Sequence, residues 1–109
     1  MPKIKIKVTI QNNNYKTNAI IREDSISYQE EDQTRVNYNY RNNILIRENN
    51  NIKMEYDFLN KNGKILLKDL NKVLEIKIKV NKIKKENYNI EIEYEIENEN
   101  INYRIEEIK

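Results

Sequence analysis

The sequence predicts an all-β protein, a small antiparallel up-and-down barrel of about eight to ten strands that spans residues 1–109 as one domain. Large apolar side chains alternate with polar ones along most of the chain, as they do in strands that bury one face. Clusters rich in Asn, Asp and Glu interrupt this alternation at short, regular intervals. An open sheet of such strands would expose its edges to other chains, whereas closure into a barrel removes those edges. A flat sandwich is the alternative architecture.

The predicted strands follow one another with only short turns between them. Asn can serve in these turns because it tolerates left-handed backbone conformations that most residues avoid. The stretch "NKNG" around Gly63 is the clearest hairpin turn, and the spacing of Leu66, Leu70 and Val73 suits a single helical turn. From the alternation we expect strands at about residues 3–10, 15–21, 26–30, 36–40, 44–48, 52–58, 65–67, 74–83, 90–97 and 101–105.

Rows of opposite charge set the expected register of the last strands. Lysines occupy the polar positions of one strand, and glutamates occupy those of the next. A tight turn at residues 86–87 would place Lys79 opposite Glu93, and a phase slip near Asn81 predicts a bulge there. A second turn at residues 98–99 would bring the same glutamate opposite a base on the last strand. The acidic row is then a solvated outer face, and the alternate positions face the core: Ile76, Ile78, Ile92, Tyr94, Ile96 and Tyr103.

The composition favours a folded domain and removes several classes of function. Charged residues make up 35% of the chain, but 20 bases nearly balance 18 acids. Aliphatic residues and Phe supply roughly a quarter of all positions, which is enough for a core. The absence of Cys excludes disulfides, thiol nucleophiles and thiolate metal sites. The absence of His removes the usual general base and the commonest transition-metal ligand. We therefore expect no metal, no cofactor and no catalytic residue, and we lean against an enzyme.

Expectations for location and partners follow from the same features. The first ten residues lack the apolar run of a signal peptide, and no stretch approaches the ~20 apolar residues of a membrane span. We expect a cytoplasmic protein with no membrane partner. Lysines and glutamates are interleaved and the net charge is only +2, which argues against nucleic-acid binding. The sequence leaves open whether the protein forms a homo-oligomer.

Four stretches of the chain, taken in order, carry a resemblance to a known family. They are "ISYQEED", "ILIRENNNIKMEYDF", "VLEIKIKVNKI" and "YNIEIEYEIENENINYRIEEI". The matching positions are Tyr28 and Glu30 on an early strand, Arg47 closing a middle strand, and Lys53, Met54 and Phe58 on the next. With them the chain resembles the YwiB-like family of uncharacterised bacterial proteins, which implies a small cytoplasmic calycin-like (lipocalin-like) barrel. It departs from the family at residues 49–51 and 71–72, where the family has a Gly, and at Ile78, where a Thr is common.

The candidate ligand-binding residues are Tyr28, Glu30 and Arg47. Glu30 shares alternate positions with Tyr28 and Ile26, so it should point inward or lie at the barrel mouth, and a buried carboxylate needs a base. Arg47 is the natural partner because both positions fall on the motif residues of the family resemblance, and because a guanidinium can grip a carboxylate in two places. The direction of Arg47 depends on whether Leu45 marks the inward face of its strand.

Two interpretations of this pair stay open. It can be a structural clasp that closes one end of the barrel, or Arg47 and Tyr28 can present donors to an anionic small molecule. Barrels of this size can hold one small ligand, and the calycin-like resemblance implies the same. The inward residues are large, however, and could simply fill the interior. The alternative function is a packed barrel that acts through its charged surface as a protein- or nucleic-acid-interaction module.

Overall fold

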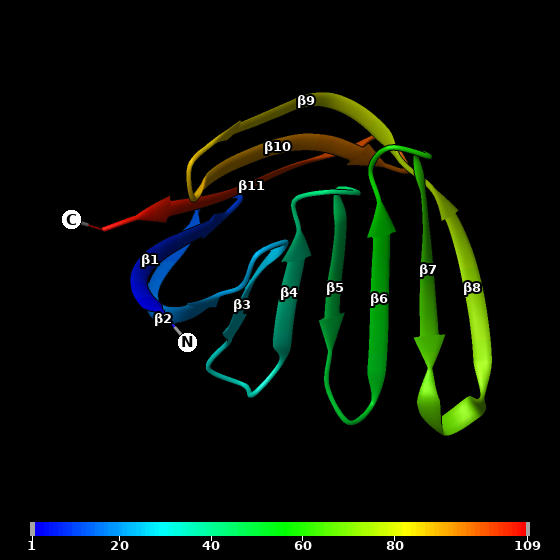
Figure 1. The fold of residues 1–109 in the computed structure, drawn as a ribbon. Coiled ribbons are helices and arrows are strands. Elements are labelled where there is room, and N and C mark those ends of the chain that lie inside the picture. The colour runs from blue at the N-terminus through cyan, green and yellow to red at the C-terminus, as the bar shows by residue number, and fades with distance from the viewer. Residues whose placement is uncertain (1, 109) are drawn as a thin grey trace.

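A computed structural model describes residues 2–108, which form a nearly closed antiparallel up-and-down barrel (Figure 1). Within these residues there are eleven strands, one more than predicted, because the expected strand at 74–83 divides at Ile78. The expected helical turn is present as η1 (Lys68–Leu70). The strands are β1 (Lys3–Ile10), β2 (Asn13–Ile21), β3 (Ser25–Gln29), β4 (Arg35–Asn39), β5 (Ile44–Glu48), β6 (Ile52–Asp57), β7 (Asn62–Leu67), β8 (Lys72–Lys77), β9 (Lys79–Glu86), β10 (Asn89–Ile96) and β11 (Glu99–Glu107).

Closure occurs as predicted between the first and last strands, with Val8 of β1 opposite Ile105 of β11. The expectation that closure removes every edge is wrong. The strand order is β8-β7-β6-β5-β4-β3-β2-β1-β11-β10-β9, so β8 and β9 each have one free edge. Between them, where the chain passes from β8 to β9, the buried Ile78 donates its backbone N–H to the carbonyl of Lys61 at 3.0 Å. Exposed lysines along β9 make its edge unattractive to another strand.

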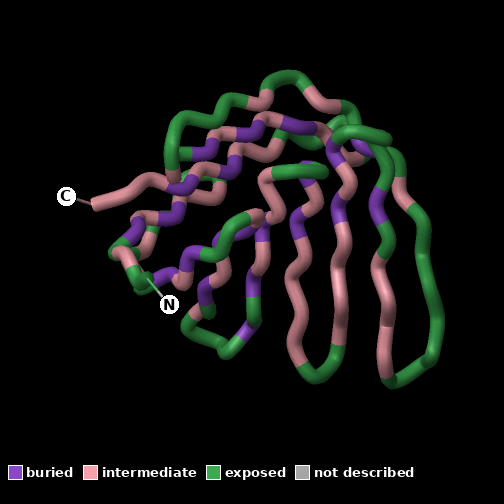
Figure 2. Tube along the Cα trace, viewed as in Figure 1, coloured by how far each residue is buried: buried purple, intermediate pink, exposed green. Residues whose placement is uncertain are grey.

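The core lies where the alternation predicts it, on one face of each strand. β10 and β11 alternate buried with partly buried residues, whereas β8 is almost entirely exposed (Figure 2). Glu93 and Glu95 lie on the outer face, so the acidic row is the outer side of a sheet. All six predicted inward residues belong to the core, four of them buried and two packed against it: Ile78, Ile92, Tyr94 and Tyr103, then Ile76 and Ile96.

The β9–β10 hairpin differs from the prediction in register. Its turn lies at residues 87–88, one residue later than expected. Lys79 therefore faces Glu95, and not Glu93. The bulge predicted near Asn81 is confirmed, because the register shifts at that point of β9. Moving the turn of a hairpin by one residue shifts every pair by two positions, which accounts for the whole difference.

The β10–β11 hairpin also differs, because its turn lies at residues 97–98, one residue earlier than expected. Both turn residues have positive φ, 52° and 67°. Two consecutive left-handed residues suit the twist of a hairpin, even where neither of them is glycine. Glu93 therefore faces Asn102, and Arg104 faces Glu91.

Glu91 is the centre of the ion pairs on this outer face. Its carboxylate lies 2.9 Å from Lys82 Nζ and also binds the guanidinium of Arg104. Hydrogen bonds from Lys82 and Arg104 lower the pKa of Glu91 from 4.5 to about 2. The folded-state pKa is depressed, so this stabilisation is fully present above pH 4.5 and is lost as the pH falls towards 2.

We expect Glu91→Gln to be less stable than the wild type at neutral pH by about 1–2 kcal/mol, because the charged hydrogen bonds are partly solvated. The difference should shrink as the pH falls from 4.5 to 2. Urea unfolding at a series of pH values measures it. Glu93→Gln, two positions along the same face, is the matched control and should change little. A difference for Glu91→Gln that is constant with pH would contradict the assignment.

Gly63 has a different role from the one predicted. The turn between β6 and β7 occupies residues 58–61, and Lys61 takes the left-handed conformation there with φ 62°. Gly63 lies inside β7, buried between Tyr56 and Ile76 on the neighbouring strands. A Cβ atom at this position would lie 2.9 Å from Ile76 Cγ1 and 3.0 Å from Tyr56 Cδ1. Glycine is therefore required here for space in the core.

Replacing Gly63 with alanine should lower the free energy of unfolding by about 1–3 kcal/mol, the usual cost of overpacking. Urea titration measures the change. Lys64→Ala, at the exposed neighbouring position, should be nearly neutral. In the background of Ile76→Ala, which removes the closest contact, Gly63→Ala should cost much less. An equal cost in both backgrounds would show that the contact with Ile76 is not the cause.

Candidate functional site

β3 and β5 bring Glu30 and Arg47 together inside the barrel. Leu45 is 1% exposed, so it marks the inward face of β5, and Arg47 follows on the same face. Glu30 comes directly after β3, where its backbone N–H donates to the carbonyl of Thr34 at 2.8 Å and fixes the start of the loop. Arg47 Nη2 lies 2.5 Å from Glu30 Oε1, with the side chains 28% and 11% exposed. The predicted contact and the inward direction of Glu30 are both confirmed.

Three tyrosines extend this pair into a larger polar cluster. The hydroxyl of Tyr15 donates to Glu30 Oε2 at 2.9 Å, and the hydroxyls of Tyr28 and Tyr103 bind each other. The sequence-based site included Tyr28 but missed Tyr15. The sequence did carry a signal for Tyr15. It lies an even number of residues before the buried Ala19, so both side chains point to the same face of β2. Tyr103 was predicted to face inward. Its contact with Tyr28 could not be predicted, because the two residues are far apart in the sequence.

Burial controls the charge state of the cluster. It raises the pKa of Tyr15, and the neighbouring Tyr28 and the hydrogen bond to Glu30 raise it further. Burial and the neighbouring Tyr103 likewise raise the pKa of Tyr28. For Arg47, burial lowers the pKa, but the hydrogen bond and charge of Glu30 outweigh it and the net pKa is raised. The cluster at neutral pH is therefore a guanidinium with neutral phenols around it.

Arg47 keeps an unused donor. Its Nε is buried and has no hydrogen-bond partner within the described chain, although Nη2 binds Glu30. Buried donors without a partner are rare in folded proteins and call for an explanation, such as local strain, a functional role or a bound water or ion. The positive charge of Arg47 also acts on Tyr56 and Tyr94, lowering the pKa of each against a larger increase from burial. The guanidinium thus lies among aromatic rings with one N–H still to be satisfied.

The barrel wall opens beside this cluster, between β2 and β3. The two strands pair only from Ala19–Tyr28 to Ile21–Ile26, and the first part of β2 separates from β3. The hydrogen bond from Tyr15 to Glu30 crosses the separation. A hollow of about 400 Å³ lies at this point, and its lining combines two carboxylates, one lysine and neutral polar side chains: Tyr15, Lys16, Thr17, Gln29, Glu30, Glu31 and Gln33. Glu30 lines this hollow, whereas Arg47, which binds Glu30 through Nη2, does not.

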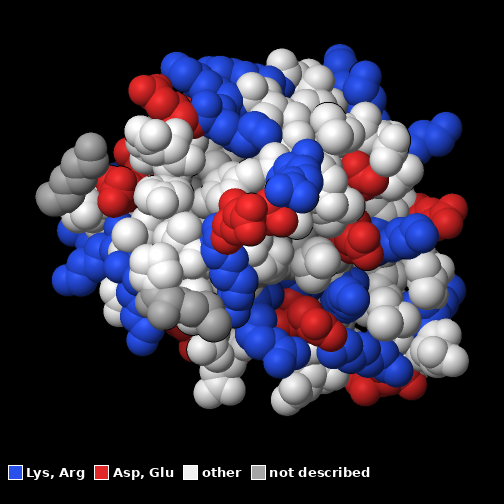
Figure 3. All heavy atoms as spheres, in the orientation of Figure 1, with Lys and Arg blue, Asp and Glu red and all other residues white. Residues whose placement is uncertain are grey.

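The adjacent acids Glu30, Glu31 and Asp32 do not converge. Glu30 points to Arg47, Asp32 accepts the backbone N–H of Thr34 at 3.1 Å, and Glu31 is exposed. Over residues 2–108 no group of three acidic side chains is placed to hold a metal ion, and no helix there has the length and apolarity to cross a membrane. Acidic and basic side chains are interspersed on the face shown in Figure 3.

The fold and the site define an antiparallel barrel whose wall opens onto a buried carboxylate–guanidinium pair. Comparison of the chain with protein-family models, with curated proteins and with solved structures finds no match. The resemblance to the YwiB-like family stays a prediction, and the assignment of Tyr28, Glu30 and Arg47 to a ligand site rests on their geometry.

Proposed function

We propose that the protein is a non-enzymatic, calycin-like barrel of the bacterial cytoplasm that binds a small organic anion at its mouth. The observation that carries this proposal is the unpartnered, buried Nε of Arg47, whose guanidinium binds Glu30 at the hollow beside β2 and β3. A cationic donor in a low-dielectric surrounding attracts an acceptor strongly, because water does not compete for it. The adjoining hollow of about 400 Å³ is within the usual size range of small-molecule sites.

The lining of the hollow supports a ligand with a polar body and one acidic group. Lys16, Gln29 and Gln33 supply donors at its rim, and Tyr15 and Glu30 lie at its inner end. In this proposal the acidic group of the ligand reaches Arg47 past Glu30, which is 11% exposed. A carboxylate suits this position because it can accept two parallel N–H groups of a guanidinium.

Ligand-observed NMR with a set of small carboxylates, including acetate, lactate and succinate, tests the proposal. We expect at least one to bind the wild type and none to bind Arg47→Met, because the methionine keeps the length of the side chain but removes its donors. Arg41→Met is the matched control, since Arg41 is exposed and pairs with Asp24 at 2.8 Å away from the opening.

Loss of folding must be separated from loss of binding. The double variant Glu30→Leu, Arg47→Met removes both members of the buried pair and should fold, because no charge is left without a partner. It should not bind the carboxylates. Binding that survives in this folded variant would overturn the site, and wild-type protein that binds none of the set would reduce the pair to a structural clasp.

A further inference from the structure

A second hollow lies on the outer wall of the barrel, over β3, β4 and β5 next to the end of β2. Its volume is about 510 Å³, and more of its lining is apolar than polar. Ile20 and Ile46 face outward into it and form its apolar floor. The hollow lies over the three residue pairs that join β2 to β3, from Ala19–Tyr28 to Ile21–Ile26. Gln29 separates it from the hollow at the barrel mouth.

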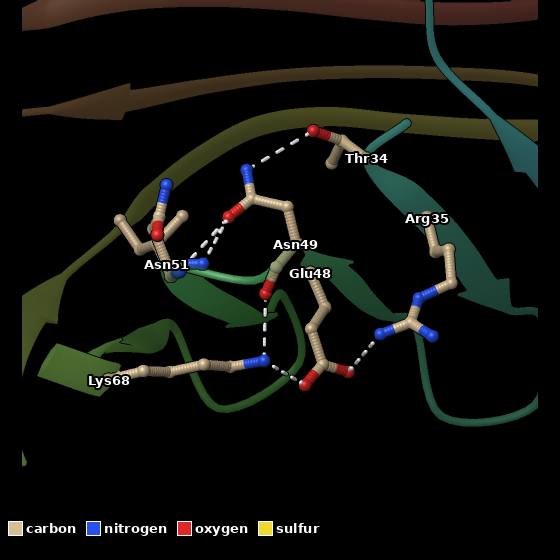
Figure 4. Close-up of polar contacts among 7 residues, drawn as sticks. Thr34, Arg35, Glu48, Asn49, Asn51 and Lys68 are labelled. Atoms are coloured by element: carbon tan, nitrogen blue, oxygen red, sulfur yellow. Dashed lines mark hydrogen bonds and ion pairs between the residues drawn. The ribbon is translucent and has the colours of Figure 1, made fainter. Parts of the chain in front are cut away.

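The rim of this outer groove is cationic. Lys3, Arg22 and Arg35 line it, and Glu48 is the one acid among the described residues around it. Glu48 is already engaged, because its Oε2 binds Lys68 Nζ at 2.8 Å and its Oε1 lies 3.9 Å from Arg35 (Figure 4). The rim therefore carries a net positive charge that the protein itself does not neutralise.

Hydrogen bonds hold the polar end of the groove in place. Arg22 Nη1 donates to Ser27 Oγ at 3.1 Å, and Asn37 Nδ2 donates to the same oxygen at 2.6 Å. Arg22 is thus directed across the outer face of β3, beside the apolar floor. Its guanidinium has five N–H donors, and the bond to Ser27 uses one of them.

We propose that the outer groove binds a small amphiphilic carboxylate, with its hydrocarbon part on Ile20 and Ile46 and its acid group at Arg22 and Arg35. Charge complementarity selects the acid, because the cations of the rim outnumber the single, engaged Glu48. The apolar floor selects the hydrocarbon part, because each CH₂ group removed from water contributes favourably to binding. This site does not depend on Arg47 or on the proposed function of the barrel mouth.

The test uses octanoate as the probe, titrated into the protein below its micelle concentration and followed by the NMR signals of isoleucine methyl groups. We expect the signals of Ile20 and Ile46 to shift with saturation. Acetate lacks the hydrocarbon part and octanamide lacks the charge, so both should bind at least about tenfold more weakly. Octanoate that binds no more tightly than either one would overturn the proposal.

Two matched pairs of variants locate the site. Ile46→Glu should weaken octanoate binding at least about tenfold, whereas Ile44→Glu, on the same outer face of β5 but outside the groove, should not. Arg22→Gln should weaken it, whereas Arg41→Gln should not. The double variant Glu30→Leu, Arg47→Met, which should fold, should leave octanoate binding unchanged. Loss of binding in this folded double variant with retention in Ile46→Glu would place the ligand at the mouth and overturn the outer-groove inference. Equal effects of Ile44→Glu and Ile46→Glu would also overturn it.

Discussion

Replacing Ile92 with alanine should lower the free energy of unfolding by about 2–5 kcal/mol, the usual range for truncating a fully buried aliphatic side chain. Ile92 is 0% exposed and lies on β10 between Ile83 of β9 and Tyr103 of β11. The strands on both sides are held by their own backbone hydrogen bonds, so they cannot close the space that the side chain leaves. Equilibrium unfolding in urea measures the loss.

The adjacent Glu93→Ala is the control for this measurement. Glu93 is on the opposite face of the same strand, where side chains are partly solvated. Its removal should cost less than about 1 kcal/mol, the worth of an exposed charge pair. Comparable losses at both positions would mean that β10 does not have one inner and one outer face.

Replacing Arg47 with methionine should destabilise the protein by about 3–5 kcal/mol, because Glu30 would stay buried without its charged partner. The side chain of Glu30 is only 11% exposed, so water can take the place of the guanidinium only in part. Tyr15 would still donate one hydrogen bond, but a phenol does not balance a charge. Thermal unfolding and urea titration both report this loss.

The double variant Glu30→Leu, Arg47→Met separates the unpaired charge from the loss of packing. Replacing a whole buried ion pair with apolar residues is often neutral, so the double variant should regain most of the stability. Arg35→Met is the exposed control, because the side chain of Arg35 is 68% exposed and its nearest acid is 3.9 Å away. A double variant as unstable as Arg47→Met alone would show that the charge of Glu30 is not the cause.

The inner face of each strand could be predicted from the sequence because it depends on alternation alone. Because side chains alternate between the two faces of a strand, Ile92 and Tyr94 face inward whatever the exact pairing is. The same argument placed Glu30 inward beside Tyr28. A buried carboxylate needs a base, and the motif positions of the family resemblance then selected Arg47. Asn71 also takes a left-handed conformation, with φ 46°, close to where the family resemblance implies a glycine.

The pairing between strands could not be predicted in the same way. Turns without glycine or proline give no sharp signal, so the turns at residues 87–88 and 97–98 were each misplaced by one residue. Gly63 was assigned to a turn because glycine is common there, although its actual reason is the space that Tyr56 and Ile76 occupy. Such contacts join strands across the barrel wall, and a single sequence carries no local trace of them.

The separation of β2 from β3 could not be predicted from the alternation of apolar and polar residues. Both strands have apolar residues at alternate positions, and nothing in either one indicates that they pair over only three residues. The opening determines which polar groups meet solvent, and it is why Tyr15 reaches Glu30 across the gap. The mouth hollow lies at this opening, and the outer groove lies over the neighbouring residue pairs.

The pairing of β1 with β11 has a consequence for how the protein reaches its folded state. In residues 2–108 it is the one pair of strands that are not successive in the chain, and it brings Ile6 opposite Glu107. The hairpins can form early because each closes a short loop, whereas this contact must close almost the whole chain at a larger entropic cost. We expect the two terminal strands to join in the last step. Weakening their contact would then shorten the lifetime of the folded barrel and leave its rate of formation nearly unchanged.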